Sequence, residues 1–133
     1  MAGEAVDERR TDDAASACWG VYSRDCATRR TLGRIADKWT MLIVGRLAAQ
    51  PMRFGALRRS IEGLSAKVLT AHLRELEADG LVHRDVEPSR PPRTTYSLTA
   101  LGLTLVETAE AMRRWAETHA GEIERHRTRS EEE

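Results

Sequence analysis

The sequence predicts a mainly helical domain that carries one small β-hairpin, and three observations lead to that prediction. From Thr31 onward, apolar residues recur every three or four positions, as they do in amphipathic helices. Residues 82–99 break this pattern with β-branched and aromatic side chains around three prolines, which is typical of two strands joined by a turn. A helical pattern then resumes and continues almost to the end of the chain. With 133 residues, the chain has room for one domain.

The first helical pattern is predicted to contain two helices. A break near Asp37 divides it, so that the second helix begins around Lys38, and Pro51 ends that helix because proline cannot continue it. The first 16 residues are charged, small and without periodicity, as in disordered segments. We predict a disordered tail over residues 1–16, a single domain over residues 17–126 and a charged C-terminal tail over residues 127–133.

The stretch RFGALRRSIEGLSAKVLTAHLRELEADGLV predicts two more helices with a short turn between them. Residues 54–61 form the first, and Ser65 is a suitable N-cap for the second. The second helix is predicted to end near Asp79, with Gly80 in the left-handed position that often follows a helix. Two helices joined by a short glycine-bearing turn are the layout of a helix-turn-helix.

The second of these helices has one apolar face and one face suited to DNA. At 100° per residue, Leu69, Leu73 and Leu76 fall together on the side expected to be buried. The opposite side carries two cations, a hydroxyl and a small methyl group, which suit the major groove, and the helix N-terminus can meet a phosphate. The residues predicted to contact DNA from this helix are Ser65, Lys67, Thr70, Ala71 and Arg74. The alternative is an ordinary solvated face, but acidic residues are confined to the C-terminal end of the helix.

The hairpin follows this helix directly and places Arg90 and Arg93 at or near its tip. A helix-turn-helix followed by a basic hairpin is a winged helix, in which the hairpin reaches the neighbouring backbone or minor groove. Arginine suits a narrow, electronegative minor groove. Three further arginines before and within the first helix of the pair are candidates for phosphate contacts: Arg53, Arg58 and Arg59.

The distribution of charge also favours a nucleic-acid partner, although the net charge is zero. Residues 1–16 carry five acidic side chains and two arginines, and residues 122–133 carry five acidic side chains and three arginines. The central residues 17–121 therefore hold a net charge of +5. A basic centre between acidic ends is a modest indication of DNA binding.

The last helix, which Thr99 can cap, carries an apolar stripe close to a heptad pattern. Packing on the protomer's own core is one interpretation, and a contact in a homodimer is the other. We favour the dimer because the helix extends beyond the domain that it would cover. The predicted interface residues are Leu105, Ala109, Met112, Trp115, Ala116 and His119.

These motifs together resemble the HxlR-type transcriptional regulators, winged-helix proteins allied to the MarR group. The resemblance covers residues 24–120 and rests on Cys26, Lys38-Trp39-Thr40, the stretch quoted above, the hairpin sequence PPRTTYSLT and Leu101-Gly102. It implies a homodimer that binds a palindromic operator in double-stranded DNA, usually near its own gene, and that dimerises through its N- and C-terminal helices. Ala27 and Ala36-Asp37 depart from the family's pattern, close to the segment implied in sensing.

The resemblance implies that Cys26 is at the position of the family's redox or electrophile sensor. Arginines nearby in sequence favour a reactive thiolate, whereas an inert, partly buried thiol is the equally weighted alternative. Cys18, the other cysteine, is eight residues away, too far for a disulfide within one straight helix, although a bond between protomers stays open. We expect both to be thiols in a reducing compartment.

The sequence contains no compact Cys/His cluster, phosphate-binding glycine loop or nucleophile motif, so we predict no metal site, no cofactor and no enzymatic activity. It also contains no membrane-spanning run and no signal-peptide core, which predicts a cytoplasmic protein. A DNA-binding regulator is therefore the first hypothesis. A winged-helix module that binds proteins, and a regulator that responds to a small-molecule effector of unknown identity while its cysteines stay silent, are the alternatives.

Overall fold

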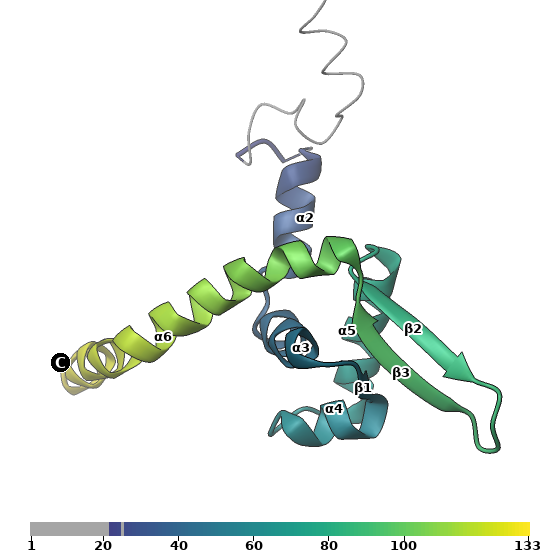
Figure 1. The fold of residues 1–133 in the computed structure, drawn as a ribbon. Helices are drawn as coiled ribbons and strands as arrows, with labels where there is room; N and C mark the ends of the chain where they lie inside the picture. Colours follow the sequence, from purple (N-terminus) through teal and green to yellow (C-terminus); the bar gives the residue numbers. More distant parts are fainter. Residues whose placement is uncertain (1–21, 25) are drawn as a thin grey trace, which may run out of the picture. The chain divides into compact units, whose positions relative to one another are not determined.

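The computed structural model describes residues 22–24 and 26–133, and the chain divides into two compact units between Asp37 and Lys38. In the first unit, α2 (Ala27–Ile35) follows Cys26, which is its N-cap residue and has an extended backbone. The second unit holds the other described elements (Figure 1). These are α3 (Lys38–Ala49), β1 (Met52–Arg53), α4 (Phe54–Ser60), α5 (Ala66–Ala78), β2 (Val82–Glu87), β3 (Arg93–Leu98) and α6 (Ala100–Glu132).

The fold class is confirmed as a mainly helical winged helix-turn-helix, with one addition to the wing. The sheet has three antiparallel strands in the order β1-β3-β2, so that β3 is central. Met52 pairs with Tyr96, and Arg53 pairs with Thr95. The sequence predicts only the hairpin of β2 and β3, because a strand of two residues is too short to show alternation. Its pairing ties the start of α4 to the base of the wing.

The core of the second unit forms where α3, α4 and α5 meet the sheet. Ile43, Val44, Leu57 and Leu69 have no exposed surface. Removing a side chain of this size from water stabilises the folded state by about 1.5–3 kcal/mol. The other apolar residues buried in this unit are Leu47, Ile61, Leu64, Leu73, Leu76, Leu81, Val82 and Ala109. The three leucines predicted for the buried face of α5 are all among these residues.

The end of α5 is a Schellman motif, which directs the chain from the helix into the wing. Gly80 has φ +77° and donates its N–H to the carbonyl of Glu77, and the Leu81 N–H bonds to the carbonyl of Leu76 at 2.9 Å. Leu76 and Leu81 are both buried, which is the apolar contact that accompanies this motif. Gly80 is therefore confirmed in the left-handed position.

The start of α6 is attached to the same turn. Thr99 donates its N–H to the Leu81 carbonyl at 3.0 Å and its hydroxyl to the Gly80 carbonyl at 2.6 Å. The Thr99 Oγ1 also accepts the N–H of Gly102 at 3.0 Å, so the predicted cap is present. The end of α5, the wing and α6 therefore share one hydrogen-bonded junction.

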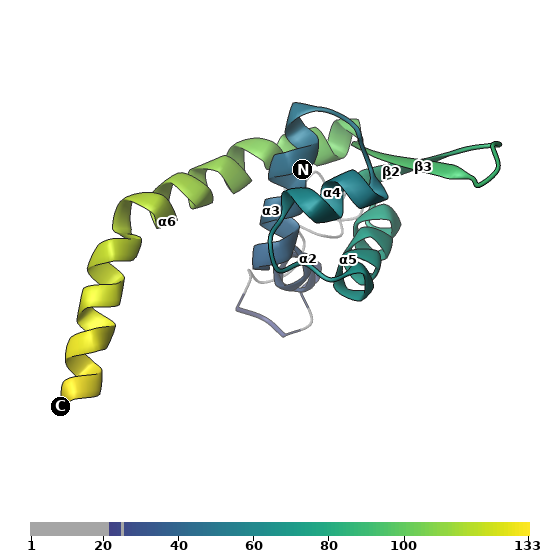
Figure 2. The same cartoon turned by 90° about the horizontal axis from the view of Figure 1, so that it is seen from below.

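Helix α6 packs against α3 through its first half, and its second half extends away from the rest of the second unit (Figure 2). It has 33 residues and continues to Glu132, so residues 127–132 of the predicted charged tail are helical. In the described part of the chain, no helix is both long enough and apolar enough to cross a membrane.

Candidate nucleic-acid interface

The turn between α4 and α5 is held by local hydrogen bonds and one glycine. Gly63 has φ +84°, a conformation that favours glycine. The Leu64 N–H bonds to the carbonyl of Ile61, and Ser65 Oγ accepts the N–H of Val68 at 3.1 Å. The predicted N-cap is therefore present, and it leaves the Ser65 O–H free to act as a donor.

Helix α5 presents the face that the sequence predicts. Lys67, Ala71 and Arg74 are exposed, and Thr70 is half-buried. The Thr70 hydroxyl donates to the carbonyl of Ala66 at 2.8 Å, so its hydrogen is already engaged. Thr70 can therefore offer DNA a methyl group or an acceptor oxygen, but not the donor that its hydroxyl suggests.

Both wing arginines lie at the distal end of the hairpin and are exposed. Arg90 is in the turn between the strands, and Arg93 is the first residue of β3. Arg93 stands directly opposite Glu87 in the register, a neighbour that the sequence analysis missed. If Val82 is paired with Leu98, counting five residues outward along each strand places Glu87 opposite Arg93.

The three candidate phosphate contacts cluster around α4. Arg53 is the N-cap residue of α4, and Arg58 and Arg59 lie in its last turn. All three side chains are exposed. A fourth arginine, Arg46 of α3, donates to the carbonyl of Ser60 at 3.0 Å and so ties α3 to the end of α4. Sequence reasoning missed Arg46, because its role depends on how the two helices pack.

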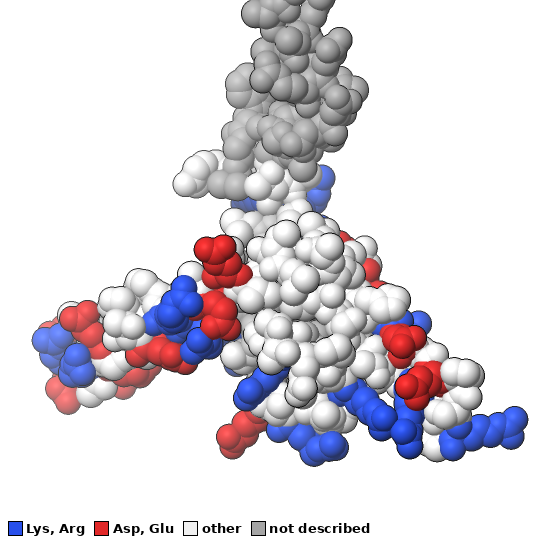
Figure 3. Space-filling view, viewed as in Figure 1, with Lys and Arg blue, Asp and Glu red and all other residues white. Residues whose placement is uncertain are grey.

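These basic side chains occupy one side of the second unit. Figure 3 shows Lys and Arg along the lower edge, below α4 and out along the wing, while α6 carries mixed charges. The Lys and Arg residues contributed by α4, α5 and the wing are Arg58, Arg59, Lys67, Arg74, Arg84, Arg90 and Arg93. The second unit therefore has the positive footprint that a polyanion requires.

The structure separates the predicted interface residues of α6 into two groups. Ala109 is buried inside the protomer, where α6 packs on α3, and Leu105 is half-buried. Met112 and Trp115 are 52% and 58% exposed, and the Trp115 ring stacks on His119 with centroids 4.6 Å apart. Ala109 is thus part of the protomer's own core, whereas the exposed pair has apolar surface available for a partner.

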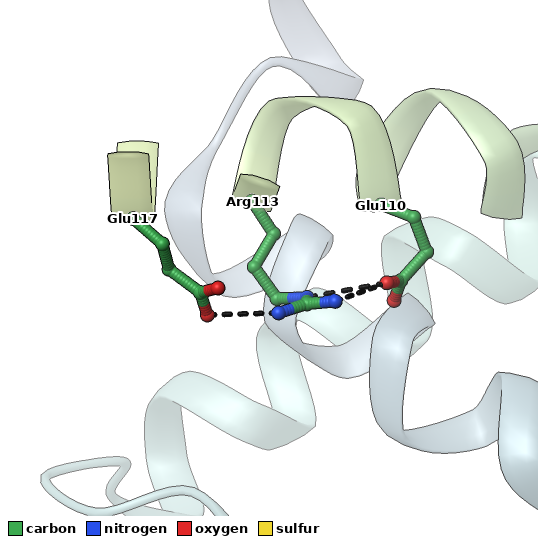
Figure 4. A network of polar contacts seen from close by, with 3 residues as sticks. All are labelled: Glu110, Arg113 and Glu117. Atoms are coloured by element: carbon green, nitrogen blue, oxygen red, sulfur yellow. Dashed lines mark hydrogen bonds and ion pairs between the residues drawn. The ribbon is translucent and has the colours of Figure 1, made fainter. Parts of the chain in front are cut away.

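Glu110, Arg113 and Glu117 form a network of polar contacts on α6 (Figure 4). Arg113 donates to Glu117 at 2.8 Å and, through Nε, to Glu110 at 3.2 Å. The hydrogen bond from Arg113 lowers the pKa of Glu110, and the two carboxylates raise the pKa of Arg113. The three side chains line a groove between α3 and α6 that also includes Met112.

Cys26 differs from the sequence expectation. It is disulfide-bonded and fully buried, so it is neither the reactive thiolate nor the partly buried thiol of the two sequence interpretations. Cys18, the only other cysteine of the chain, lies outside the described residues.

A helix-turn-helix with a wing and a one-sided basic surface defines a DNA-binding protein of the winged-helix class. Residues 34–124 match the family model described as HxlR-like helix-turn-helix. The chain belongs to this family of transcriptional regulators, which are not enzymes, and it is a helix-turn-helix transcriptional regulator.

Relatives and solved structures agree with this assignment. The HTH-type transcriptional regulator YybR of Bacillus subtilis is 37% identical over 103 residues, which cover 77% of this chain and 82% of YybR. The structure of the transcriptional regulator ytfH from Salmonella typhimurium matches with a TM-score of 0.76 and 32% identity, over 82% of this chain and 97% of that one. The redox regulator HypR in its reduced form matches with a TM-score of 0.67 and 37% identity, over 73% of this chain and 96% of that one.

Proposed function

We propose that this protein is a homodimer that binds a palindromic operator in a promoter near its own gene. The observation that carries the proposal is that Lys67 and Arg74 on α5 and Arg90 and Arg93 at the end of the wing are all exposed. A helix and a wing arranged in this way can enter neighbouring grooves of one duplex. Membership of a family of transcriptional regulators supports the same conclusion.

The proposed roles follow from the chemistry of each side chain. Lys67, Thr70, Ala71 and Arg74 contact base edges in the major groove, and Ser65 contacts a phosphate at the helix N-terminus. At the wing, Arg90 and Arg93 enter the minor groove. The phosphate contacts around α4 come from Arg53, Arg58 and Arg59.

A homodimer accounts for the palindromic operator, because two-fold symmetry in the protein requires two-fold symmetry in the DNA site. The exposed Met112 and Trp115 on α6 support a contact between protomers at this helix. Ala116 and His119 continue the same stripe, and Leu105 flanks it.

The test of the proposal is fluorescence anisotropy of the protein on its own upstream DNA and on a scrambled duplex, across a series of salt concentrations. We expect a preference of about a thousandfold or more for the upstream DNA, and an affinity that falls steeply with salt. The variant Arg74→Ala should lose about ten- to hundredfold in operator affinity, because it removes a base contact. Arg125→Ala, an exposed arginine on the distal part of α6, is the matched control and should bind normally.

Equal binding to both duplexes would contradict sequence-specific recognition near the gene. An absence of binding even at low salt would contradict the DNA-binding proposal altogether. The winged helix would then be a module for binding another protein. In that case Arg74→Ala and the wild-type protein would not differ in DNA binding.

We further propose that the redox state of Cys26 controls operator affinity. The disulfide at Cys26 and the similarity to the redox regulator HypR, solved in reduced and oxidized forms, support this regulation. Reduction of the disulfide by a dithiol reductant takes up two electrons and two protons and yields two thiols, while the reductant becomes a disulfide.

Operator affinity measured with and without dithiothreitol tests this regulation. The affinity of the wild-type protein should change with reduction, and that of Cys26→Ser should not, because the variant has no disulfide at this position to reduce. If the wild-type affinity is the same in both conditions, the cysteines are silent, and a small-molecule effector becomes the better explanation for release from the operator.

A further inference from the structure

We propose that Arg84 and Tyr96 form a DNA-backbone contact in the angle between α5 and the wing, and that Glu77 positions Arg84 for it. This inference rests on the proposed function. It adds residues that belong neither to the DNA-reading face of α5 nor to the wing tip.

The register of the sheet brings the two contact residues together. Arg84 of β2 is directly opposite Tyr96 of β3, so both side chains project from the same face of the wing. Two residues closer to the base, Val82 is opposite Leu98, and Val82 is buried. Arg84 and Tyr96 therefore lie on the face of the wing whose base, at Val82, is part of the core. Strand β2 also packs against α5.

Glu77 connects this face of the wing to the recognition helix. Its Oε1 lies 3.6 Å from Nε of Arg84, and the two side chains are 41% and 48% exposed. An ion pair so open to water contributes little to the stability of the fold. We therefore consider a role for this pair in positioning Arg84. The closest approach of the two side chains is at Nε of Arg84, and the two terminal amino groups of a guanidinium carry four further N–H donors. A guanidinium held in this way can present two parallel donors to a phosphate.

The Tyr96 hydroxyl is a second donor at the same place. Burial raises the pKa of Tyr96 above its usual 10.0, although Arg84 opposes the shift, so the hydroxyl stays protonated at neutral pH. No other described residue hydrogen-bonds to it. Arg74, on the DNA-reading face of α5, also lies within electrostatic reach of this hydroxyl. Two cations and one acid around the hydroxyl leave a net positive charge.

The geometry of DNA explains why a phosphate would lie here. A helix in the major groove and a wing in the adjacent minor groove straddle the sugar-phosphate backbone that separates the two grooves. That backbone must pass through the angle between α5 and the wing. Arg84 and Tyr96 are the donors on the wing side of this angle, and contacts of this kind fix the register of the protein without reading sequence.

The experiment compares operator and scrambled duplex affinities of Tyr96→Phe and Arg84→Gln across a salt series. Tyr96→Phe keeps the ring and should bind about two- to tenfold more weakly. Arg84→Gln should reduce the slope of log affinity against log salt by about one and weaken binding to both duplexes alike. Arg125→Gln is the control and should leave the slope unchanged. Thermal unfolding should show that all variants keep the wild-type melting temperature.

The double variant Glu77→Arg with Arg84→Glu separates a DNA contact from a structural ion pair. It restores the pair with its charges reversed, but it moves the cation off the wing, so we expect operator affinity to stay low. Full recovery of affinity would overturn the inference, as would an unchanged salt slope in Arg84→Gln while the wild-type protein binds its operator. If the wild-type protein itself does not bind DNA, the proposed function fails first and this contact fails with it.

Discussion

Gly102 and Gly121 both lie in α6, but their surroundings differ. Gly121 has room for a side chain, and Gly102 does not. A Cβ at Gly102 would clash with the carbonyl oxygen of Leu81. That oxygen accepts the N–H of Thr99 and cannot move without breaking the junction. A Cβ at Gly121 would meet only the end of the Arg125 side chain, at 3.5 Å.

We therefore expect Gly102→Ala to lower the free energy of unfolding by about 1–3 kcal/mol, because the backbone of α6 must move away from Leu81. Gly121→Ala is the matched control and should raise helix stability by up to about 1 kcal/mol, because alanine favours the helix. Urea unfolding followed by circular dichroism measures both changes. Equal effects of the two substitutions would contradict the close approach at Gly102.

At the scale of elements, α5 could be predicted almost completely and β1 could not. Local chemistry determines α5, since Ser65 caps it, Gly80 ends it, and its leucines recur at helical spacing. The exposed positions of Lys67 and Arg74 follow from the same periodicity. In contrast, β1 exists only because two residues pair with β3, far along the chain.

The parts of the candidate site that escaped prediction depend on packing between elements. The ion pair of Glu77 with Arg84 requires knowledge of how α5 lies against β2. The burial of Ala109 requires the position of α3 on α6. A single sequence shows which face of each helix is apolar, but not which neighbour covers it.

At the scale of the whole molecule, the proposed dimer gives a prediction for α6. Replacing Met112 and Trp115 together by glutamate places two charges on exposed apolar surface and should convert a dimer to monomers. Sedimentation equilibrium measures the change, and affinity for the full palindrome should fall toward that for a half-site. Thr128→Glu, an exposed residue on the opposite side of the same helix, is the control and should stay dimeric. A wild-type protein that sediments as a monomer at all concentrations would rule out this dimer.

Helix α6 is one continuous element, yet its two halves differ in what holds them. Near Ala109 the helix is part of the core, so its backbone can open only when the fold opens. From Ala120 to Glu133 every residue is exposed, and in isolation a helix of this length is only marginally stable in water. The distal half is therefore expected to fray from its end, and a partner that orders it must offset the lost conformational entropy with binding free energy.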